Sequence, residues 1–507
     1  MPYSILVLII NKYSGKRSSL KSIFGETLNE YKIFVQRIGL VGITNILIAL
    51  SSLILLPIVT KSFSINDYGT WVIIITTIAL IPNLANLGLP YTMVRFLSAE
   101  RDKEKIREDF YSIASIVLIS SFIISALLFI FSNVVAAALF NGDVNIAQLL
   151  SIIVFLACLN AFLLNFFRTF QQMTRYSIIL LVQTYLGVFI VSYFAIKGYG
   201  IFIAAIGLLI ANLVTLFIMI LFILSNIGFK FPKFKNMREY LSFGLPTIPA
   251  NLSSWIVESS DRYVIGILLG TAFVGYYSPG YTLGNIIVMV LAPFALLLPS
   301  VLPKYYDENN LEKVRIFIKY SMKYFLLIAI PAAFGLSILS KPILMILTTP
   351  DIATNGYLVT PFVAASAVLF GVYAIAGNVL ILEKRTKLMG TTWIIAAVLN
   401  LILNIIFVPI LGIIGAALMT LIAYLVAFII TMAYSIKFFK FDFDLIFILK
   451  SLAASVLMGG IIVLINPNGI LNILITVIMS TVVYFILLII LKGMNKDEFK
   501  FMRELFM

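Results

Sequence analysis

Long apolar runs separated by short polar stretches fill the chain from residue 38 onward. A helix of about 20 apolar residues crosses the hydrocarbon core of a membrane. Fourteen runs have this character, at 38–60, 68–90, 110–140, 147–167, 177–196, 201–225, 241–269, 273–302, 320–340, 357–382, 388–408, 412–436, 445–465 and 470–491. The pattern predicts an all-α polytopic membrane protein with about 14 transmembrane helices.

The two halves of the chain resemble each other in sequence. Short motifs recur at a nearly constant offset, pairing 67–71 with 273–277, 104–107 with 312–315, 173–175 with 385–387, and 200–205 with 412–417. An even number of helices separates the copies, so the two sets of six helices should have the same orientation in the membrane. Such parallel repeats are typical of transporters that hold substrate between their halves. Chance likeness between Leu- and Ile-rich helices is the alternative, which four matched anchors disfavour.

The repeat and the loops between the runs predict the domain organisation. The expected parts are a cytoplasmic N-terminal tail (1–37), a six-helix lobe (38–225), a basic cytoplasmic linker (226–240), a second six-helix lobe (241–436), and two extra helices with a cytoplasmic C-terminal tail (437–507).

Composition excludes several classes of chemistry. Hydrophobic residues make up 62% of the 507 residues and charged residues 11%, whereas soluble proteins carry about 25% charged residues. A water-soluble enzyme is therefore excluded. The chain has no histidine and one cysteine, Cys158, so it lacks the side chains for imidazole catalysis, Cys/His metal sites and disulfides. No Walker-type phosphate loop is present, and we expect no cofactor.

The net charge of +14 reflects orientation. The terminal tails, every second loop and the helix ends next to them together carry 32 of the 36 Lys and Arg residues, whereas the opposite loops hold only Lys61, Lys197 and Lys341. Cytoplasmic loops of membrane proteins carry such an excess of cations. We therefore expect both termini to be cytoplasmic in a multi-pass protein of the cell membrane. Nucleic acid is not an expected partner.

Three charged side chains, Glu258, Asp261 and Arg262, lie well inside one predicted span, 241–269. They share one helical face, with Glu258 about 40° from Arg262 and about 60° from Asp261. Three unpaired charges at the bilayer centre cost about 8–10 kcal/mol on insertion scales, so they require partners or a watery cavity. The i, i+4 spacing predicts that Glu258 pairs with Arg262, which leaves Asp261 as a surplus anion.

Two interpretations of this charged face stay open. In the functional one, the face lines a central cavity, Arg262 contacts a substrate phosphate through its bidentate guanidinium, and Glu258 or Asp261 tunes it or takes up a coupling cation. In the structural one, the charges form an ion pair that locks this helix to its neighbours. Pro246 and Pro249 precede the charged face, and they fit either a hinge or an ordinary helix start.

Four further residues are weaker binding candidates. Asn251 continues the charged face toward the cytoplasm, and Asn45 is an amide within the first span. Buried amides more commonly bond between helices. Arg95 and Arg168 lie near cytoplasmic helix ends. Their side chains either snorkel to lipid headgroups or bind a pyrophosphate headgroup as it enters, and the first role is the commoner one.

Several motifs, in this order and spacing, match a known family. They are Leu56-Pro57-Ile58-Val59-Thr60, Asp67-Tyr68-Gly69, Asn86-Leu87-Gly88-Leu89, Ser260-Asp261-Arg262-Tyr263, Val274-Gly275-Tyr276-Tyr277 and Gly412-Ile413-Ile414-Gly415-Ala416-Ala417. From about residue 35 to its C-terminus, the chain resembles the polysaccharide and O-antigen flippases of the multidrug/oligosaccharidyl-lipid/polysaccharide exporter superfamily. The resemblance implies a two-lobed, V-shaped bundle that moves lipid-linked oligosaccharides by alternating access.

This resemblance implies a flippase for surface polysaccharide biosynthesis and not an enzyme. The expected partners are a lipid-linked oligosaccharide with a pyrophosphate headgroup, membrane lipids, a coupling cation and glycan-assembly enzymes. The alternative is an ion-coupled multidrug exporter of the same superfamily, whose members commonly carry an ion-binding acid in the first helix. The run 38–60 has no acid. A membrane glycosyltransferase or polymerase is disfavoured, because the longest outer loop, about 341–356, holds a single acid, Asp351.

Overall fold

The computed structural model describes residues 17–441 and 444–493, and every regular element in these residues is a helix. The first half contains α2 (Arg17–Ser62), α3 (Ile65–Ala85), α4 (Leu89–Leu97), α5 (Lys103–Ile130), α6 (Ser132–Leu139), α7 (Val144–Thr169), α8 (Met173–Ile196) and α9 (Gly200–Ile227). The second half contains α10 (Met237–Gly244), η1 (Leu245–Thr247), α11 (Ile248–Leu268), α12 (Thr271–Asn285), η2 (Ile286–Leu291), α13 (Ala292–Asp307), α14 (Leu311–Leu347), α15 (Pro350–Gly356), α16 (Val359–Leu382), α17 (Thr386–Phe438), α18 (Leu445–Ile465) and α19 (Ile470–Ile490). The all-α membrane fold is confirmed.

Twelve helices in the described residues are long and apolar enough to cross a membrane. One of them, α17, is two helices, because Gly412 has a φ of +63° and a ψ of −147°. The Asn400 amide donates to the Thr420 hydroxyl at 3.3 Å, although a straight helix would separate these residues by about 30 Å. The chain therefore turns back at Gly412, and α17 crosses twice. With the charged helix α11, the candidate crossings number fourteen, and the predicted count of about 14 stays a prediction.

Several predicted runs are divided by local breaks. The run 110–140 is α5 and α6, and 273–302 is α12, a 3₁₀ segment and α13. Pro246 and Pro249 lie at a similar break, where the 3₁₀ turn η1 separates α10 from α11. Proline removes a helical hydrogen bond and so favours such a break. At the N-terminus, residues 17–37 of the predicted tail are part of α2, and residues 1–16 lie outside the described residues.

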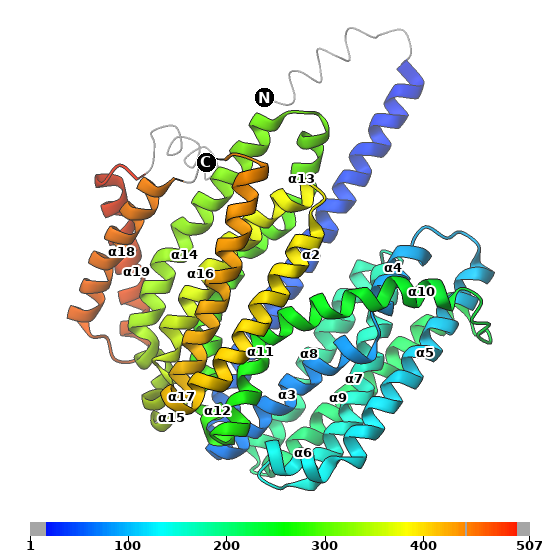
Figure 1. Cartoon of the computed structure of the whole chain (residues 1–507), viewed down its shortest axis with the longest axis horizontal. Helices are drawn as coiled ribbons and strands as arrows, with labels where there is room; N and C mark the ends of the chain where they lie inside the picture. Colours follow the sequence, from blue (N-terminus) through cyan, green and yellow to red (C-terminus); the bar gives the residue numbers. More distant parts are fainter. Residues whose placement is uncertain (1–16, 442–443, 494–507) are drawn as a thin grey trace.

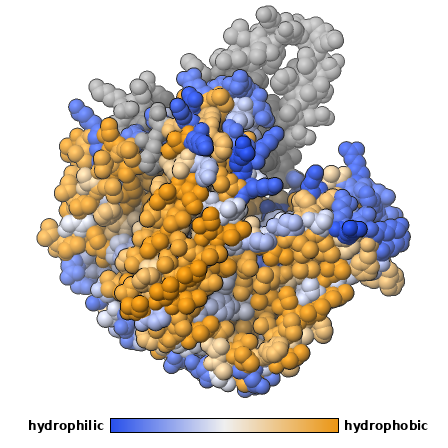
Figure 2. Space-filling view, in the orientation of Figure 1, coloured by the Kyte–Doolittle hydropathy of each residue, from blue (hydrophilic) through white to orange (hydrophobic). Residues whose placement is uncertain are grey.

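The helices form two lobes that meet at one end and diverge at the other (Figure 1). Helices α3 to α9 make up one lobe, with α2 packed on α8, and α12 to α19 make up the other. Helix α11 lies between them and packs against both α3 and α17. Figure 2 shows a broad hydrophobic band across both lobes, with hydrophilic residues gathered at opposite ends of the molecule. This is the surface that a helical bundle presents to lipid.

The lobes are in direct backbone contact at the closed end. A Cβ atom added to Gly69 of α3 would overlap the carbonyl oxygen of Thr271 at the start of α12. Gly275 is equally tight, because a Cβ there would lie 2.7 Å from the carbonyl oxygen of Ile65. Both glycines belong to the repeated motifs at 67–71 and 273–277, so equivalent parts of the two lobes form this contact. The Lys61 ammonium adds a hydrogen bond of 2.7 Å to the carbonyl of Ile346.

At the opposite end, the segment between α9 and α10 is fastened to the first lobe. Lys230 pairs with Glu104 at 2.7 Å and lies 3.6 Å from Glu108. The Ser112 hydroxyl accepts the backbone N–H groups of residues 233 and 234. Helix α10 itself is held to α4, where the Thr92 hydroxyl donates to the carbonyl of Tyr240 at 3.0 Å. Helix α10 therefore packs with the first lobe, although the sequence pattern joins it to the first span of the second.

Candidate functional site

The charged side chains of α11 form a different pair from the one that helical spacing favours. Arg262 Nη1 donates to Asp261 Oδ1 at 2.8 Å and to the backbone carbonyl of Glu258 at 2.5 Å. Asp261 is 1% exposed and also accepts the backbone N–H of Arg262 at 2.9 Å. The surplus anion is therefore Glu258, an exposed residue whose side chain makes no hydrogen bond or salt bridge among the described residues, although Arg262 attracts it from one turn away.

Two tyrosines of the next helix complete the surroundings of this pair. The Tyr277 hydroxyl donates to the second oxygen of Asp261. The Arg262 guanidinium lies over the Tyr281 ring, 3.8 Å from its centroid, and 5.6 Å from the Tyr277 centroid. Burying a charged pair is costly unless its remaining hydrogen-bonding capacity is used, and cation–π contact adds attraction on the open face of the guanidinium. The two tyrosines of helix α12 thereby offset part of the free-energy cost of burying the charged pair of α11.

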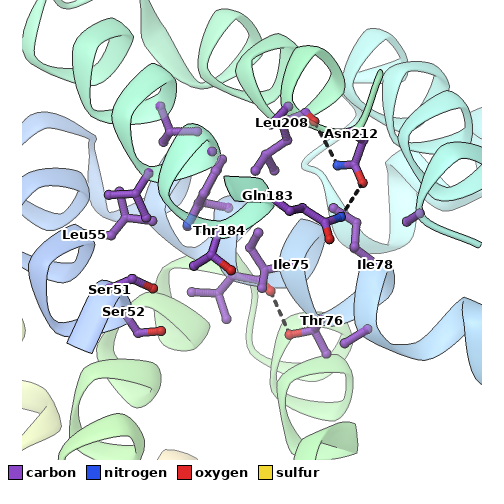
Figure 3. A pocket seen from close by; sticks show the side chains of 18 of the residues that line it. Ser51, Ser52, Leu55, Ile75, Thr76, Ile78, Gln183, Thr184, Leu208 and Asn212 are labelled. Atoms are coloured by element: carbon purple, nitrogen blue, oxygen red, sulfur yellow. Dashed lines mark hydrogen bonds between the residues drawn. The ribbon is translucent and has the colours of Figure 1, made fainter. Parts of the chain in front are cut away.

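A cavity of about 840 Å³ opens beside this pair. It is lined mainly by the first lobe, from α2, α3, α7, α8 and α9, and by two residues each of α11 and α12. Among the described residues that line it, Arg262 alone is charged. The polar remainder consists of hydroxyls and amides, including Ser51, Thr76, Gln183 and Thr184, which Figure 3 shows around the same hollow.

A buried amide network fixes one wall of the cavity. Asn160 of α7 donates to the side chain of Asn212 of α9 at 2.9 Å and to the Thr215 hydroxyl at 3.3 Å. Gln183 of α8 donates to the same Asn212 oxygen at 3.2 Å (Figure 3). Three helices are thus joined by side-chain amides, which is a common way to fix helix positions inside a membrane.

The other predicted residues lie away from the cavity lining. Asn251 accepts a hydrogen bond from the Tyr91 hydroxyl at 3.2 Å, which links α11 to α4. Asn45 is exposed on α2, and Arg95 and Arg168 are exposed in the last turns of α4 and α7. None of these four is among the residues that line the cavity, so the structure brings together only Arg262 and Asp261 of the predicted set, with Glu258 beside them.

Sequence reasoning missed most of the cavity. Tyr277 and Tyr281 are spaced i, i+4 and therefore share one face of a helix, but nothing in the sequence shows that this face meets Arg262. Polar side chains within apolar spans were a usable signal for Gln183 and Asn212, because such residues face the interior of a bundle. In the described residues, no cluster of three or more Cys, Asp or Glu side chains could hold a metal ion.

Family comparison agrees with the resemblance seen in the motifs. The family described as "Polysaccharide biosynthesis protein" matches residues 34–304, and the family MatE matches residues 246–406. The chain belongs to the polysaccharide biosynthesis protein family. Its membership confirms the resemblance stated from the sequence.

Two curated relatives come from Haloferax volcanii. The "probable low-salt glycan biosynthesis flippase Agl15" is 24% identical over 275 residues, which are 54% of this chain and 58% of Agl15. The "probable flippase AglR" is 28% identical over 175 residues, which are 34% of this chain and 35% of AglR. The chain therefore matches little more than half the length of the one and about a third of the other.

Solved transporters share the fold. The lipid II flippase MurJ, in an inward closed conformation, superposes with a TM-score of 0.73 at 20% identity and covers 88% of this chain and 97% of MurJ. A multidrug resistance MATE transporter in an inward-facing conformation gives a TM-score of 0.62 at 19% identity and covers 78% and 97%. At these identities the likeness concerns the fold alone.

Proposed function

We propose that this protein is a flippase that moves a lipid-linked oligosaccharide from the cytoplasmic to the outer leaflet of the cell membrane, for the biosynthesis of a surface polysaccharide. The observation that carries the proposal is Arg262, the single charged group among the described lining residues of a large, neutral polar cavity. An arginine there can hold a phosphate, while neutral hydroxyls and amides accommodate sugars. The names of the Haloferax relatives support the same substrate class.

The direction of transport rests on the charge distribution. Thirty-two of the 36 cations lie on the side that holds both termini, and such an excess marks the cytoplasmic face. The lobes touch at the opposite end through Gly69 and Thr271. The conformation is therefore closed toward the outside, and the headgroup would enter from the cytoplasm while its lipid tail stays in the bilayer.

Energy coupling would involve Glu258. Glu258 is an exposed residue without a side-chain hydrogen bond or salt bridge among the described residues, and it lies one turn from Arg262. Asp261 is unsuited to the role, because Arg262 and Tyr277 already occupy both of its oxygens. A proton or metal cation at Glu258 would remove the surplus negative charge near the phosphate. Lipids and enzymes of glycan assembly are the expected partners, and transport itself needs no catalytic group.

The charge of the lining also separates a flippase from a cationic-drug exporter. The single charged group among the described lining residues is an arginine, which can bind an anionic group, so the MATE-like fold does not by itself favour a cationic drug as substrate. An arginine instead selects for anionic groups such as phosphates.

The test is a strain that lacks this gene, complemented with variants and assayed for surface polysaccharide and for lipid-linked sugar on the cytoplasmic face. The double variant Arg262→Gln with Asp261→Asn removes the cation without leaving a buried unpaired charge, so it should fold. We expect it to abolish export and to accumulate the lipid-linked intermediate. Arg385→Gln, which changes an exposed cation outside the cavity, serves as the control. Full export by the double variant would refute the proposal.

A further inference from the structure

A second hollow, of about 620 Å³, lies on the far side of α11 from the cavity at Arg262. Residues of α3, α5, α6 and α7 line it from the first lobe, α11 lines it along its length, and Leu401 and Ile405 of α17 line it from the second lobe. At about 100° per residue, Ser260 and Val264 in its lining lie about 160° from Arg262 around the axis of α11. We call this hollow the inter-lobe groove, because its walls belong to different lobes.

The inter-lobe groove presents apolar side chains. Twelve of its sixteen described lining residues are Leu, Ile or Val, and none of the sixteen is charged. The Thr77 hydroxyl donates to a carbonyl of its own helix at 2.8 Å and therefore accepts from Tyr263 at 2.5 Å. The Ser260 hydroxyl donates to Asn400 at 3.3 Å, and the indole nitrogen of Trp255 is buried. A ligand in the groove therefore contacts mainly hydrocarbon.

The groove opens toward lipid. Among its lining residues, Ile267 and Leu268 of α11 and Ile405 of α17 are 58%, 43% and 52% exposed. The surface around these helices is part of the hydrophobic band that crosses both lobes (Figure 2). Water does not fill an apolar hollow, and an empty one forfeits the dispersion contacts of its lining. A lipid chain is the occupant that the surroundings supply.

The groove is long enough for one lipid chain. Its lining residues on α11 run from Trp255 to Leu268, and a helix rises about 20 Å over that interval. One leaflet of a bilayer holds about 15 Å of hydrocarbon, half the thickness of the membrane core. A single chain can therefore lie along the groove over its whole length.

The groove is separate from the site of a lipid whose phosphate lies at Arg262. Helices α3 and α11 stand between the two hollows, so that Thr76 lines the cavity and its neighbour Thr77 lines the groove. The hydrogen bond between Thr77 and Tyr263 joins the two helices at this point. The tail of a substrate would have to pass between them to reach the groove, so the occupant is a different lipid.

We infer that the inter-lobe groove binds one hydrocarbon chain of a bilayer lipid, which packs between the lobes and favours the conformation in which they touch. Val135 and Leu139 of α6 form part of one wall, and Leu401 and Ile405 of α17 form the other. Both walls contact the chain only while the lobes are close at this end, and a ligand that binds one conformation better shifts the population toward it. The inference goes beyond the proposed function, because it does not depend on which substrate is carried.

The test measures contact between lipid chains and Trp255, which lines the groove. Trp71→Phe with Trp393→Phe leaves Trp255 as the single tryptophan of the chain. The full chain is reconstituted in phosphatidylglycerol vesicles with a rising fraction of the same lipid brominated in mid-chain, since bromine quenches tryptophan fluorescence on contact. We expect the fluorescence to fall in direct proportion to the brominated fraction, because one bound lipid gives a linear dependence and several exchanging lipids give a curved one.

A groove-filling variant and a matched control locate the contact. Val135→Phe with Leu401→Phe fills the groove from both walls and should abolish most of the quenching. The control is Val134→Phe with Ile402→Phe, because these neighbours are 66% and 51% exposed and lie outside the lining, and it should be quenched as the parent is. Gly69→Ala opposes the contact between the lobes and should lower the quenching, because coupling between conformation and binding is reciprocal.

The outcomes separate the parts of the inference. Absence of quenching, equal quenching in the groove-filling variant and its control, or a curved dependence on the brominated fraction overturns the site. Unchanged quenching in a folded Gly69→Ala protein overturns the preference for the conformation in which the lobes touch. Relief of quenching by an unbrominated polyprenyl phosphate assigns the groove to the substrate tail and overturns a bilayer lipid as its occupant. None of these results changes the case for Arg262 and the flippase.

Discussion

The glycine contact at the closed end should set the balance between the two conformations of the transporter. In Gly69→Ala, the new Cβ would overlap a backbone carbonyl, that of Thr271, which cannot rotate away as a side chain can. Overpacking of this kind costs about 1–3 kcal/mol. The cost falls only on the state in which α3 and α12 touch, so the equilibrium should shift by about 5- to 150-fold toward the state that is open at this end.

The shift can be measured by double electron–electron resonance, which gives the distance between spin labels on the two lobes. Lys197→Cys, between α8 and α9, and Thr354→Cys, in α15, place labels on exposed positions of opposite lobes near the contact. Cys158→Ala removes the natural thiol, which is buried. We expect the Gly69→Ala protein to show a second, longer distance population, and to flip substrate more slowly because it returns less readily to the closed state.

The control is Gly390→Ala, in α17, because an added Cβ there meets nothing within 4 Å. Both substitutions raise helix propensity by about 0.5–1 kcal/mol, so a change seen only at Gly69 reflects the contact between the lobes. A folded Gly69→Ala protein with the parental distance distribution would refute the reasoning. A second variant, Gly275→Ala, tests the symmetric position and should act in the same direction.

Three further predictions concern stability and charge. Asn212→Leu removes the side-chain oxygen that accepts hydrogen bonds from Asn160 and Gln183 and should cost about 1–3 kcal/mol, seen as a lower melting temperature. Arg262→Gln alone leaves a buried carboxylate unpaired and should cost about 3–5 kcal/mol, seen as a loss of monodisperse protein that the double neutral variant recovers. Lys105 holds the pKa of Glu100 at about 2, below its usual 4.5. Their ion pair thus stabilises the loop above pH 4.5 and is lost as the pH falls through about 2. Lys105→Met should return the pKa of Glu100 toward 4.5 in a ¹³C NMR titration.

Hydropathy predicted the spans because burial in lipid imposes one requirement, an apolar stretch of sufficient length, on every crossing. It could not predict where helices break. The interruption at Ile286–Leu291 is itself apolar, so hydropathy treats the run as continuous, although Asn285 before it and Pro293 after it mark its ends. The break before α11 was signalled by Pro246 and Pro249, because proline acts through its own backbone.

The charged face shows a similar limit. Spacing placed Glu258 and Arg262 on one side of α11, and of these two residues Arg262 alone lines the cavity. Which acid pairs with Arg262 depends on α12, because the Tyr277 hydroxyl holds one oxygen of Asp261 and orients the other toward the guanidinium. A contact between helices decides the pairing, and a single-helix rule such as i, i+4 has no information about it.

The pairing of Arg262 also bears on how a transporter releases what it binds. An arginine without a partner in an empty cavity would gain its full interaction on meeting a phosphate and would hold it tightly. Here Asp261 already neutralises the guanidinium, so a phosphate gains only the difference between two ionic partners. Transport requires that a substrate bind favourably enough to enter and weakly enough to leave. Arg262 meets this requirement, because it has an anionic partner both in the empty cavity and when a phosphate is bound.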